Sequence, residues 1–251
     1  MSKKRSIIPN TFTMGNMVMG FFAIIFASRY DAEQGNIEVI AAAGILIFIA
    51  SLFDASDGAI ARALKVQSEM GEQLDSLADA ISYGIAPGVI AYKAYLYQLP
   101  GMGNDIDLGM LVAIVFPVCA IFRLAKFNVS ESAPGFKGLP SPAAGILVSS
   151  IPALWSVNSL FFGDLSYYMP LEWYIAVFIA AAFLMVTPFD YSKVFSDIYR
   201  KSKKYAAISF LIILIFLIIF QMWTVFVMTS VYTLFGTCLY YYKKASSYKR
   251  K

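Results

Sequence analysis

Histidine is absent from this 251-residue chain, and cysteine occurs only twice, as Cys119 and Cys238. Without histidine the chain has no His-based triad, no His–metal site and no His acid or base, so proton transfer falls to carboxylates, Lys, Tyr, Cys or water. Both cysteines lie in apolar runs without a CxxC partner, which argues against a zinc site or a disulfide framework. Any bound metal would be held by oxygen, which favours hard cations such as Mg²⁺, Mn²⁺ or Ca²⁺.

Charge is also scarce, because charged residues make up 14% of the chain and hydrophobic residues 59%, with a mean hydropathy of +0.66. Soluble domains average about 25% charged residues. A soluble helical fold of this length could not bury so much apolar surface, whereas lipid tolerates helices that are apolar all round. The composition therefore predicts an all-α, polytopic membrane helix bundle. The short basic tails suit anionic lipid headgroups, and no nucleic-acid partner is expected.

Eight apolar stretches have the length of about 17 to 25 residues that crosses a bilayer. The stretches are 13–29, 39–62, 72–96, 108–127, 141–162, 171–188, 205–221 and 224–242. The last two form one run that is too long for a single crossing, so we place a turn near Gln221–Thr224. No internal repeat, low-complexity segment or soluble region interrupts the pattern, and residues 1–251 are predicted to form one integral membrane domain.

Basic and acidic loops alternate between these stretches. Lys and Arg gather at both ends of the chain and in the second, fourth and sixth loops, as expected of cytoplasmic segments. The intervening loops carry the acids Asp31, Glu33, Glu38, Asp105, Asp107, Asp164 and Glu172. This alternation requires an even number of spans and predicts that both termini are cytoplasmic. The basic start, residues 3–5, is interpreted as a cytoplasmic anchor of the first span rather than as part of a signal peptide.

Four aspartates lie in or beside the second and third stretches, although ionisable groups at membrane depth are costly and usually functional. Helical spacing places them on two faces, one with Asp54, Asp57, Gly58 and Ala61, the other with Gly71, Asp75 and Asp79. The short connection 63–70 allows the two helices to be antiparallel neighbours. We therefore expect the two acidic faces to meet near the cytoplasmic surface.

Four carboxylates in one cleft repel each other, and one or two Mg²⁺ or Mn²⁺ ions would neutralise them economically. Gly58 and Gly71 leave room for a ligand, while Arg62 and Lys65 are phosphate-binding side chains at the mouth. Together these features favour phosphoryl transfer on a phosphorylated substrate. The alternatives are solvated helix ends paired with the basic residues, a cation transporter that uses intramembrane aspartates, and a structural scaffold. The missing repeat disfavours the transporter.

The spacing D-x2-D-G-x2-A-R-x8-G-x3-D-x3-D resembles the signature of the CDP-alcohol phosphotransferase family. The chain matches its fixed positions at Asp54, Asp57, Gly58, Ala61, Arg62, Gly71, Asp75 and Asp79. The resemblance implies that the four aspartates hold a divalent metal pair on the CDP diphosphate, with Asp79 as general base. It also implies that the CDP site is lined by Asn10, Gly58, Ala61, Arg62, Ser68 and Gly71. The implied reaction is displacement at the β-phosphorus by an alcohol, with CMP leaving.

Four further segments resemble the phosphatidylserine synthases within that family. These segments are 8–20, 82–87, 123–128 and 136–142. The resemblance implies CDP-diacylglycerol and L-serine as substrates, a homodimer, and a location in the cytoplasmic membrane with the active site facing the cytoplasm. Tyr83 stands where phenylalanine is commoner, a difference that we expect to leave the chemistry unchanged. The alternative acceptors within the family are glycerol phosphate, an inositol phosphate and an archaeal ether-lipid substrate system.

Candidate acceptor-binding residues lie in or beside the fourth loop. Arg123 and Asn128, assisted by Lys137, are predicted to bind serine or its phosphate partner, because an arginine fork suits a carboxylate. The alternative is that they only anchor a cytoplasmic loop. Asn10 and Thr13 precede the first stretch, where they either aim a helix N-terminus at phosphate or cap an interfacial helix.

Overall fold

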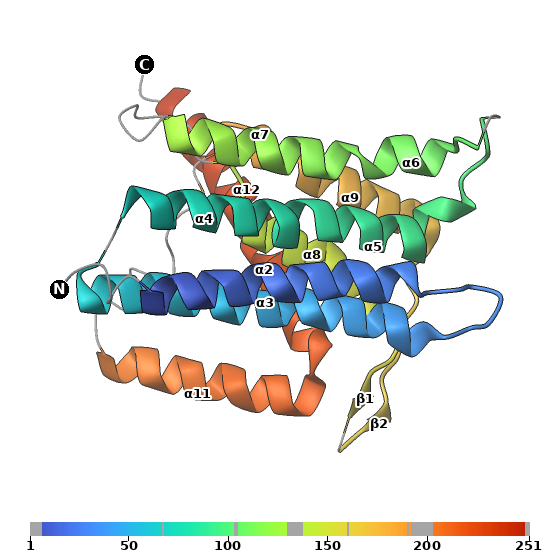
Figure 1. Cartoon of the computed structure of the whole chain (residues 1–251), viewed down its shortest axis with the longest axis horizontal. Helices are drawn as coiled ribbons and strands as arrows, with labels where there is room; N and C mark the ends of the chain where they lie inside the picture. Colours follow the sequence, from blue (N-terminus) through green and yellow to red (C-terminus); the bar gives the residue numbers. More distant parts are fainter. Residues whose placement is uncertain are drawn as a thin grey trace.

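The protein is an assembly of helices with one short hairpin, as a computed structural model shows (Figure 1). The structure describes residues 7–66, 68–102, 105–129, 138–159, 161–189, 191 and 203–248. The helices of the first half are α2 (Ile7–Ser28), α3 (Ile37–Leu64), α4 (Glu69–Asp79), a π-helical segment (Ala80–Ile85), α5 (Ala86–Ala94), a 3-10 turn (Leu96–Gln98), α6 (Leu108–Ala113) and α7 (Val115–Val129). The second half contains α8 (Ser141–Ala153), β1 (Asn158–Ser159), β2 (Gly163–Asp164), α9 (Leu171–Val186), α11 (Lys203–Phe220) and α12 (Met222–Tyr248).

The first helix begins earlier than the hydropathy predicted. Helix α2 starts at Ile7, so Asn10 and Thr13 lie within it rather than before it. Their side chains therefore project from a helix face and do not cap its first turn. Pro9 is tolerated here because the N–H groups of the first helical turn have no intrahelical acceptor, so the N–H group that proline lacks is not needed.

The predicted second and third spans are confirmed as helices joined by a tight connection. Helix α3 ends where Lys65 adopts a left-handed conformation with φ 53°. Ser68 then caps α4, because its hydroxyl accepts a 3.1 Å hydrogen bond from the Gly71 N–H group. The expected stretch 72–96 is formed by α4, the π-helical segment and α5 in succession, which run as one rod in Figure 1.

The expected span 141–162 is wrong in its second half. Helix α8 ends at Ala153, directly after Pro152, which cannot donate a backbone hydrogen bond. Strand β1 (Asn158–Ser159) then pairs antiparallel with β2 (Gly163–Asp164), and Gly163 has a φ of +74°. Phe161 and Phe162 extend the apolar stretch in the sequence, but the two paired strands show that the chain turns back instead of continuing the helix.

The turn placed near Gln221–Thr224 is confirmed. Gln221 separates α11 from α12 and has a positive φ of 48°. Its side-chain amide donates a 2.7 Å hydrogen bond to the Asn158 carbonyl, and the Ser159 hydroxyl donates one of the same length to the Ile219 carbonyl. The hairpin therefore supports the turn between the last two helices.

Helix α8 lies at the centre of the packing, in contact with α3, α5, α9 and α12. An aromatic cluster fills the core beside it, where the rings of Tyr95 and Tyr174 stack at 4.0 Å and Trp155 meets Tyr95 edge-on. The Trp155 indole also donates a 2.9 Å hydrogen bond to the Tyr95 hydroxyl, which satisfies both buried polar groups. This rigid core holds the helices that carry the acidic residues.

Four helices of the described residues are long and apolar enough to cross a membrane, within Ile7–Ser28, Ile37–Leu64, Leu108–Val129 and Met222–Tyr242. Shorter apolar helices are Ser141–Ala153, Leu171–Val186 and Leu211–Phe220. Together with the composition, they define an all-α integral membrane protein. The start of α2, the α3–α4 connection and the end of α12 lie at the same end of the molecule (Figure 1). An even number of crossings is consistent with this arrangement.

Candidate active site

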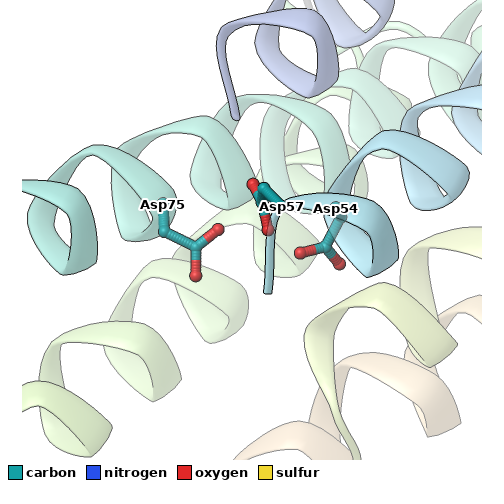
Figure 2. A group of neighbouring side chains, drawn as sticks. All are labelled: Asp54, Asp57 and Asp75. Carbon is teal, nitrogen blue, oxygen red and sulfur yellow. The ribbon is translucent and has the colours of Figure 1, made fainter. Parts of the chain in front are cut away.

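Three carboxylates meet where α3 and α4 face each other. Asp54, Asp57 and Asp75 each offer an oxygen, and these oxygens all lie within 4.8 Å of one another. Figure 2 shows the three side chains, two from α3 and one from α4, converging on one space. The helical spacing therefore predicted the meeting of the two acidic faces correctly.

Asp79, the fourth predicted acid, is not a member of this group of three. It lies one turn after Asp75 on α4 and is 9% exposed, and its Oδ1 accepts a 3.1 Å hydrogen bond from the Asn16 side-chain amide. Asp79 is thus held on the α2 side of the cluster.

Neutral donors hold two members of the group of three. The Thr13 hydroxyl contacts Asp57 Oδ2 at 2.6 Å, and the Tyr83 hydroxyl donates a long 3.5 Å hydrogen bond to Asp54 Oδ2. Asp75 has no such support, since its Oδ1 is buried without a hydrogen-bond partner among the described residues. A buried carboxylate oxygen without a donor is costly.

These carboxylates fit a divalent cation. Three oxygens of hard, anionic character converge from two helices, and the unpartnered Asp75 oxygen gains a partner only from a cation, a proton or a ligand. Arg62, in the last turn of α3, lines the cavity beside Asp57. Asp54, Asp57 and Asp75 are therefore the residues that would hold a metal.

A cavity of about 170 Å³ opens beside Asp57 and Asp75. All six residues predicted for the CDP site line it, namely Asn10, Gly58, Ala61, Arg62, Ser68 and Gly71. A methyl group on Gly71 would lie 3.2 Å from Ser68 Oγ and 3.4 Å from Asn10 Oδ1, so the glycine keeps this wall open. The structure brings together residues that are up to 61 positions apart, from Asn10 on α2 to Gly71 on α4. We call this space the motif cavity.

A second cavity, of about 720 Å³, lies between α4 and α7. Asp75 lines both cavities, whereas Asp79, Arg123 and Asn128 line only this second one. Asn128 exchanges hydrogen bonds of 3.0 and 3.2 Å with Ser76, which ties α7 to α4. We call this space the α7 cavity, and Asp75 and Glu72 line both this cavity and the motif cavity.

Arg123 is the basic residue of the α7 cavity. Its Nη1 donates a 2.9 Å hydrogen bond to the Ser141 hydroxyl at the start of α8, and its Nε is buried without a partner among the described residues. An arginine with unused donors facing a cavity is suited to a carboxylate or phosphate ligand. Lys137, predicted to assist it, lies outside the described residues, as do residues 3–5.

Three residues contact the acids in a way that the sequence did not predict. Asn16 belongs only to a segment that resembles the family, Thr13 is predicted to aim a helix N-terminus at phosphate or to cap a helix, and Tyr83 is only a difference from the commoner phenylalanine. A polar residue every third position on an otherwise apolar helix, Thr13 and Asn16, was the available signal. Which acid each would contact depends on how α2 packs between α3 and α4, and no sequence pattern specifies that.

The part of the chain that carries the acid spacing matches one known family of proteins. Residues 6–166 match the CDP-alcohol phosphatidyltransferase family, which is 161 of the 251 residues. The chain belongs to this family. The match covers α2 to α8 and the hairpin, so α9, α11 and α12 lie beyond it.

Within the family, the chain is similar to proteins named CDP-diacylglycerol–serine O-phosphatidyltransferase. It is 38% identical to the Bacillus subtilis protein over 140 residues, which cover 55% of this chain and 71% of that protein. It is 35% identical to the Mycobacterium leprae protein over 156 residues, 59% of this chain and 47% of that one. It is 31% identical to the Methanocaldococcus jannaschii protein over 146 residues, 58% of this chain and 60% of that one. The match thus spans 47% and 60% of the length of the last two relatives.

Proposed function

We propose that this protein transfers the phosphatidyl group of CDP-diacylglycerol to the hydroxyl of L-serine, giving phosphatidylserine and CMP. The observation that carries the proposal is the position of Asp75, in the wall shared by a cavity lined with the CDP motif and a cavity that holds Asp79 and Arg123. A donor and an acceptor bound in the two cavities would meet at this wall. The names of the similar proteins supply the identity of the two substrates.

The motif cavity takes the nucleotide end of the donor. Arg62 reaches into it from the last turn of α3 and supplies a charge for the diphosphate. Ser68 and Gly71 form the opposite wall at the start of α4, where the exposed N–H groups of a helix terminus favour a phosphate. Asn10 lies beside Gly71 and closes the cavity from α2.

Asp54, Asp57 and Asp75 would hold a pair of divalent cations, Mg²⁺ or Mn²⁺, with Asp79 at the edge of that site. When bound, the cations offset the charge of the diphosphate and of the leaving CMP. The three carboxylates would set where the cations lie, because Asp54 and Asp57 belong to α3 and Asp75 belongs to α4. Thr13 keeps Asp57 in its rotamer by the 2.6 Å hydrogen bond.

The α7 cavity takes the acceptor, and Asp79 acts as general base there. The serine Oγ forms a bond to the β-phosphorus, the bond from that phosphorus to the bridging oxygen breaks, and CMP leaves with the electron pair. The hydroxyl proton passes to the Asp79 carboxylate, which lines this cavity. Arg123 binds the serine carboxylate with donors that have no other partner, and Asn128 and Lys137 assist it.

The membrane arrangement completes the proposal. The two-chain donor enters sideways from the bilayer, and serine arrives from the aqueous phase. Asp54 and Asp57 lie in the second half of α3 and Asp75 lies in α4, toward the α3–α4 connection. We assign this end of the molecule to the cytoplasmic side of the inner membrane because its loops are basic. Eight spans with both termini in the cytoplasm, a single domain over residues 1–251 and a homodimer belong to the same proposal.

CMP release by the purified protein tests the reaction. The protein is incubated with CDP-diacylglycerol and Mn²⁺ or Mg²⁺ against EDTA, and with serine against glycerol phosphate and inositol phosphate. We expect CMP release that requires both the metal and serine, with phosphatidylserine formed in equal amount. Release with another acceptor would keep the family reaction and contradict serine as the acceptor. No release from folded protein with any acceptor would contradict the enzyme assignment.

A further inference from the structure

Asn16 is a fully buried polar side chain in the middle of α2, with 0% of its surface exposed. Its side-chain amide Nδ2 donates a 3.1 Å hydrogen bond to Asp79 Oδ1. Asn16 is not one of the described residues that line the motif cavity or the α7 cavity, whereas Asp79 lines the α7 cavity. Any effect of Asn16 on a bound substrate must therefore pass through Asp79.

The backbone around Asn16 is fixed against the same helix that carries Asp79. Ser82 lies three residues after Asp79, and its hydroxyl donates a 3.0 Å hydrogen bond to the Asn16 carbonyl. One turn along α2, Gly20 packs directly on Ser82, and a side chain at Gly20 would collide with the Ser82 backbone and hydroxyl. The Asn16 amide consequently meets Asp79 from a rigid position.

The side-chain amide of Asn16 contributes little to the stability of the folded protein. Its Oδ1 is buried and has no hydrogen-bond partner in the described part of the chain, although a buried amide oxygen without a partner costs free energy. A leucine of similar size would avoid that cost and would pack well in an apolar helix interface. A polar group retained at such a cost requires an explanation beyond stability.

We propose that Asn16 is a positioning residue that sets the orientation of the Asp79 carboxylate. The amide fixes Oδ1 on the α2 side, so that the second oxygen of Asp79 is presented to the α7 cavity, where the acceptor hydroxyl binds. The inference rests on the proposed function, since it assigns Asn16 to the residue proposed as base. It also explains why Asp79, unlike Asp75, is separated from the group of three carboxylates.

The variant Asn16→Leu removes the donor and keeps the volume. We expect kcat for phosphatidylserine formation to fall about 10-fold or more, and by no more than the ~10²–10⁴-fold that a general base contributes in total. The KM for CDP-diacylglycerol and the affinity for Mn²⁺, measured by electron paramagnetic resonance, should stay within about twofold, because the CDP site and the three metal-holding carboxylates are not touched. The melting temperature should stay within about 5 °C of the wild type.

Ser149→Ala is the matched control. Ser149 is also buried and its hydroxyl also has no partner among the described residues, but it lies on α8 and contacts no acid of the site. We expect its kcat to equal that of the wild type, which separates the loss of a buried polar group from the loss of the contact to Asp79. If Asn16→Leu does not fold, Asn16→Ser, which is too short to reach Asp79, is expected to show the same selective loss of kcat.

Three results would overturn the inference. A wild-type kcat in the folded Asn16 variant would show that Asp79 needs no partner. A loss of Mn²⁺ affinity with kcat unchanged at saturating metal would assign Asn16 to the metal site instead. Equal losses in Asn16→Leu and Ser149→Ala would indicate a structural effect only. Wild-type protein is assayed in parallel, and a wild type that releases no CMP contradicts the proposed function rather than the role of Asn16.

Discussion

The Thr13 hydroxyl on α2 lies 2.6 Å from Asp57 Oδ2 on α3, and the Asn16 amide, one turn further along α2, lies 3.1 Å from Asp79 on α4. Helix α2 thereby joins an acid from each of the two acidic helices through neutral donors. Neutral donors orient a carboxylate without cancelling its charge, whereas a lysine or arginine would compete with a bound cation. The acidic cluster therefore depends on a helix that carries none of the acids.

Thr13→Val removes this donor while keeping the β-branched shape. We expect the affinity for Mn²⁺ to fall by about 10-fold, because partners that orient a metal-holding residue typically contribute 10- to 100-fold. The measurement is Mn²⁺ binding by isothermal titration calorimetry. Thr13→Ser restores the hydroxyl and should recover most of the affinity. An unchanged affinity in Thr13→Val would show that Asp57 is oriented by the fold alone.

Tyr83→Phe should have a smaller effect than Thr13→Val. The Tyr83 hydroxyl is 3.5 Å from Asp54, at the limit of a hydrogen bond, so its removal should change the Mn²⁺ affinity and kcat by about threefold or less. The two variants are compared in one titration series. An effect of Tyr83→Phe that exceeds that of Thr13→Val would contradict the ranking by distance.

Asp75→Asn should abolish most of the activity while preserving the fold. The substitution keeps the shape of the side chain and removes a charge shared by both cavities, so we expect CMP release to fall by about 10²–10³-fold. Mn²⁺ binding should be lost in the same titration. Glu69→Gln, on the first turn of α4, removes an acid outside the group of three and should retain Mn²⁺ affinity. Equal losses in both variants would indicate a general effect of charge.

Arg123→Ala should raise the KM for serine without changing the KM for CDP-diacylglycerol. Hydrogen bonds to a charged group contribute about 1.5–3 kcal/mol, so the rise should be about 10- to 100-fold. Steady-state kinetics with each substrate varied separately provide the measurement. Lys126→Ala, on the exposed side of α7, is the control for loss of a basic residue from the same helix. A rise in the CDP-diacylglycerol KM alone would move Arg123 to the donor site.

Gly71→Ala should instead affect the binding of CDP-diacylglycerol. The added methyl would press on Ser68 Oγ and Asn10 Oδ1 in the wall of the motif cavity, at about 1 kcal/mol of steric cost. We expect the KM for CDP-diacylglycerol to rise about fivefold with an unchanged KM for serine. Gly101→Ala is the control, since a methyl there meets open space. An unchanged donor KM would contradict the assignment of this cavity to the nucleotide.

The sequence predicted the acidic site better than the course of the chain around it. Asp54, Asp57 and Asp75 converge as expected, because their spacing follows the helical period and the connection between the helices is short. The helix after Ser141 was predicted too long, because hydropathy cannot distinguish the exposed Phe161 and Phe162 beside the hairpin from the continuation of a membrane helix. Pro152 was the local signal for the correct end.

Contacts between distant segments could not be predicted in the same way. Asn16 meets Asp79 across 63 positions and Asn128 meets Ser76 across 52, and each contact depends on the order in which the helices pack. Hydropathy identifies which helix faces are apolar but not which helix fills the space between two others. The position of α2 against both acidic helices is therefore a property of the tertiary structure.

The π-helical segment Ala80–Ile85 lies between the acidic half and the apolar half of one rod. A π-helical turn contains more residues than an α-helical turn, so it changes the angular relation between the helices on either side. Deleting one residue there would rotate α4 relative to α5 by about 100° and would turn Asp79 away from α2, although no acid were lost. The distance in sequence between Asp79 and α5 is thus as much a requirement of this site as the identity of its aspartates, and insertions or deletions at 80–85 should be tolerated less well than substitutions.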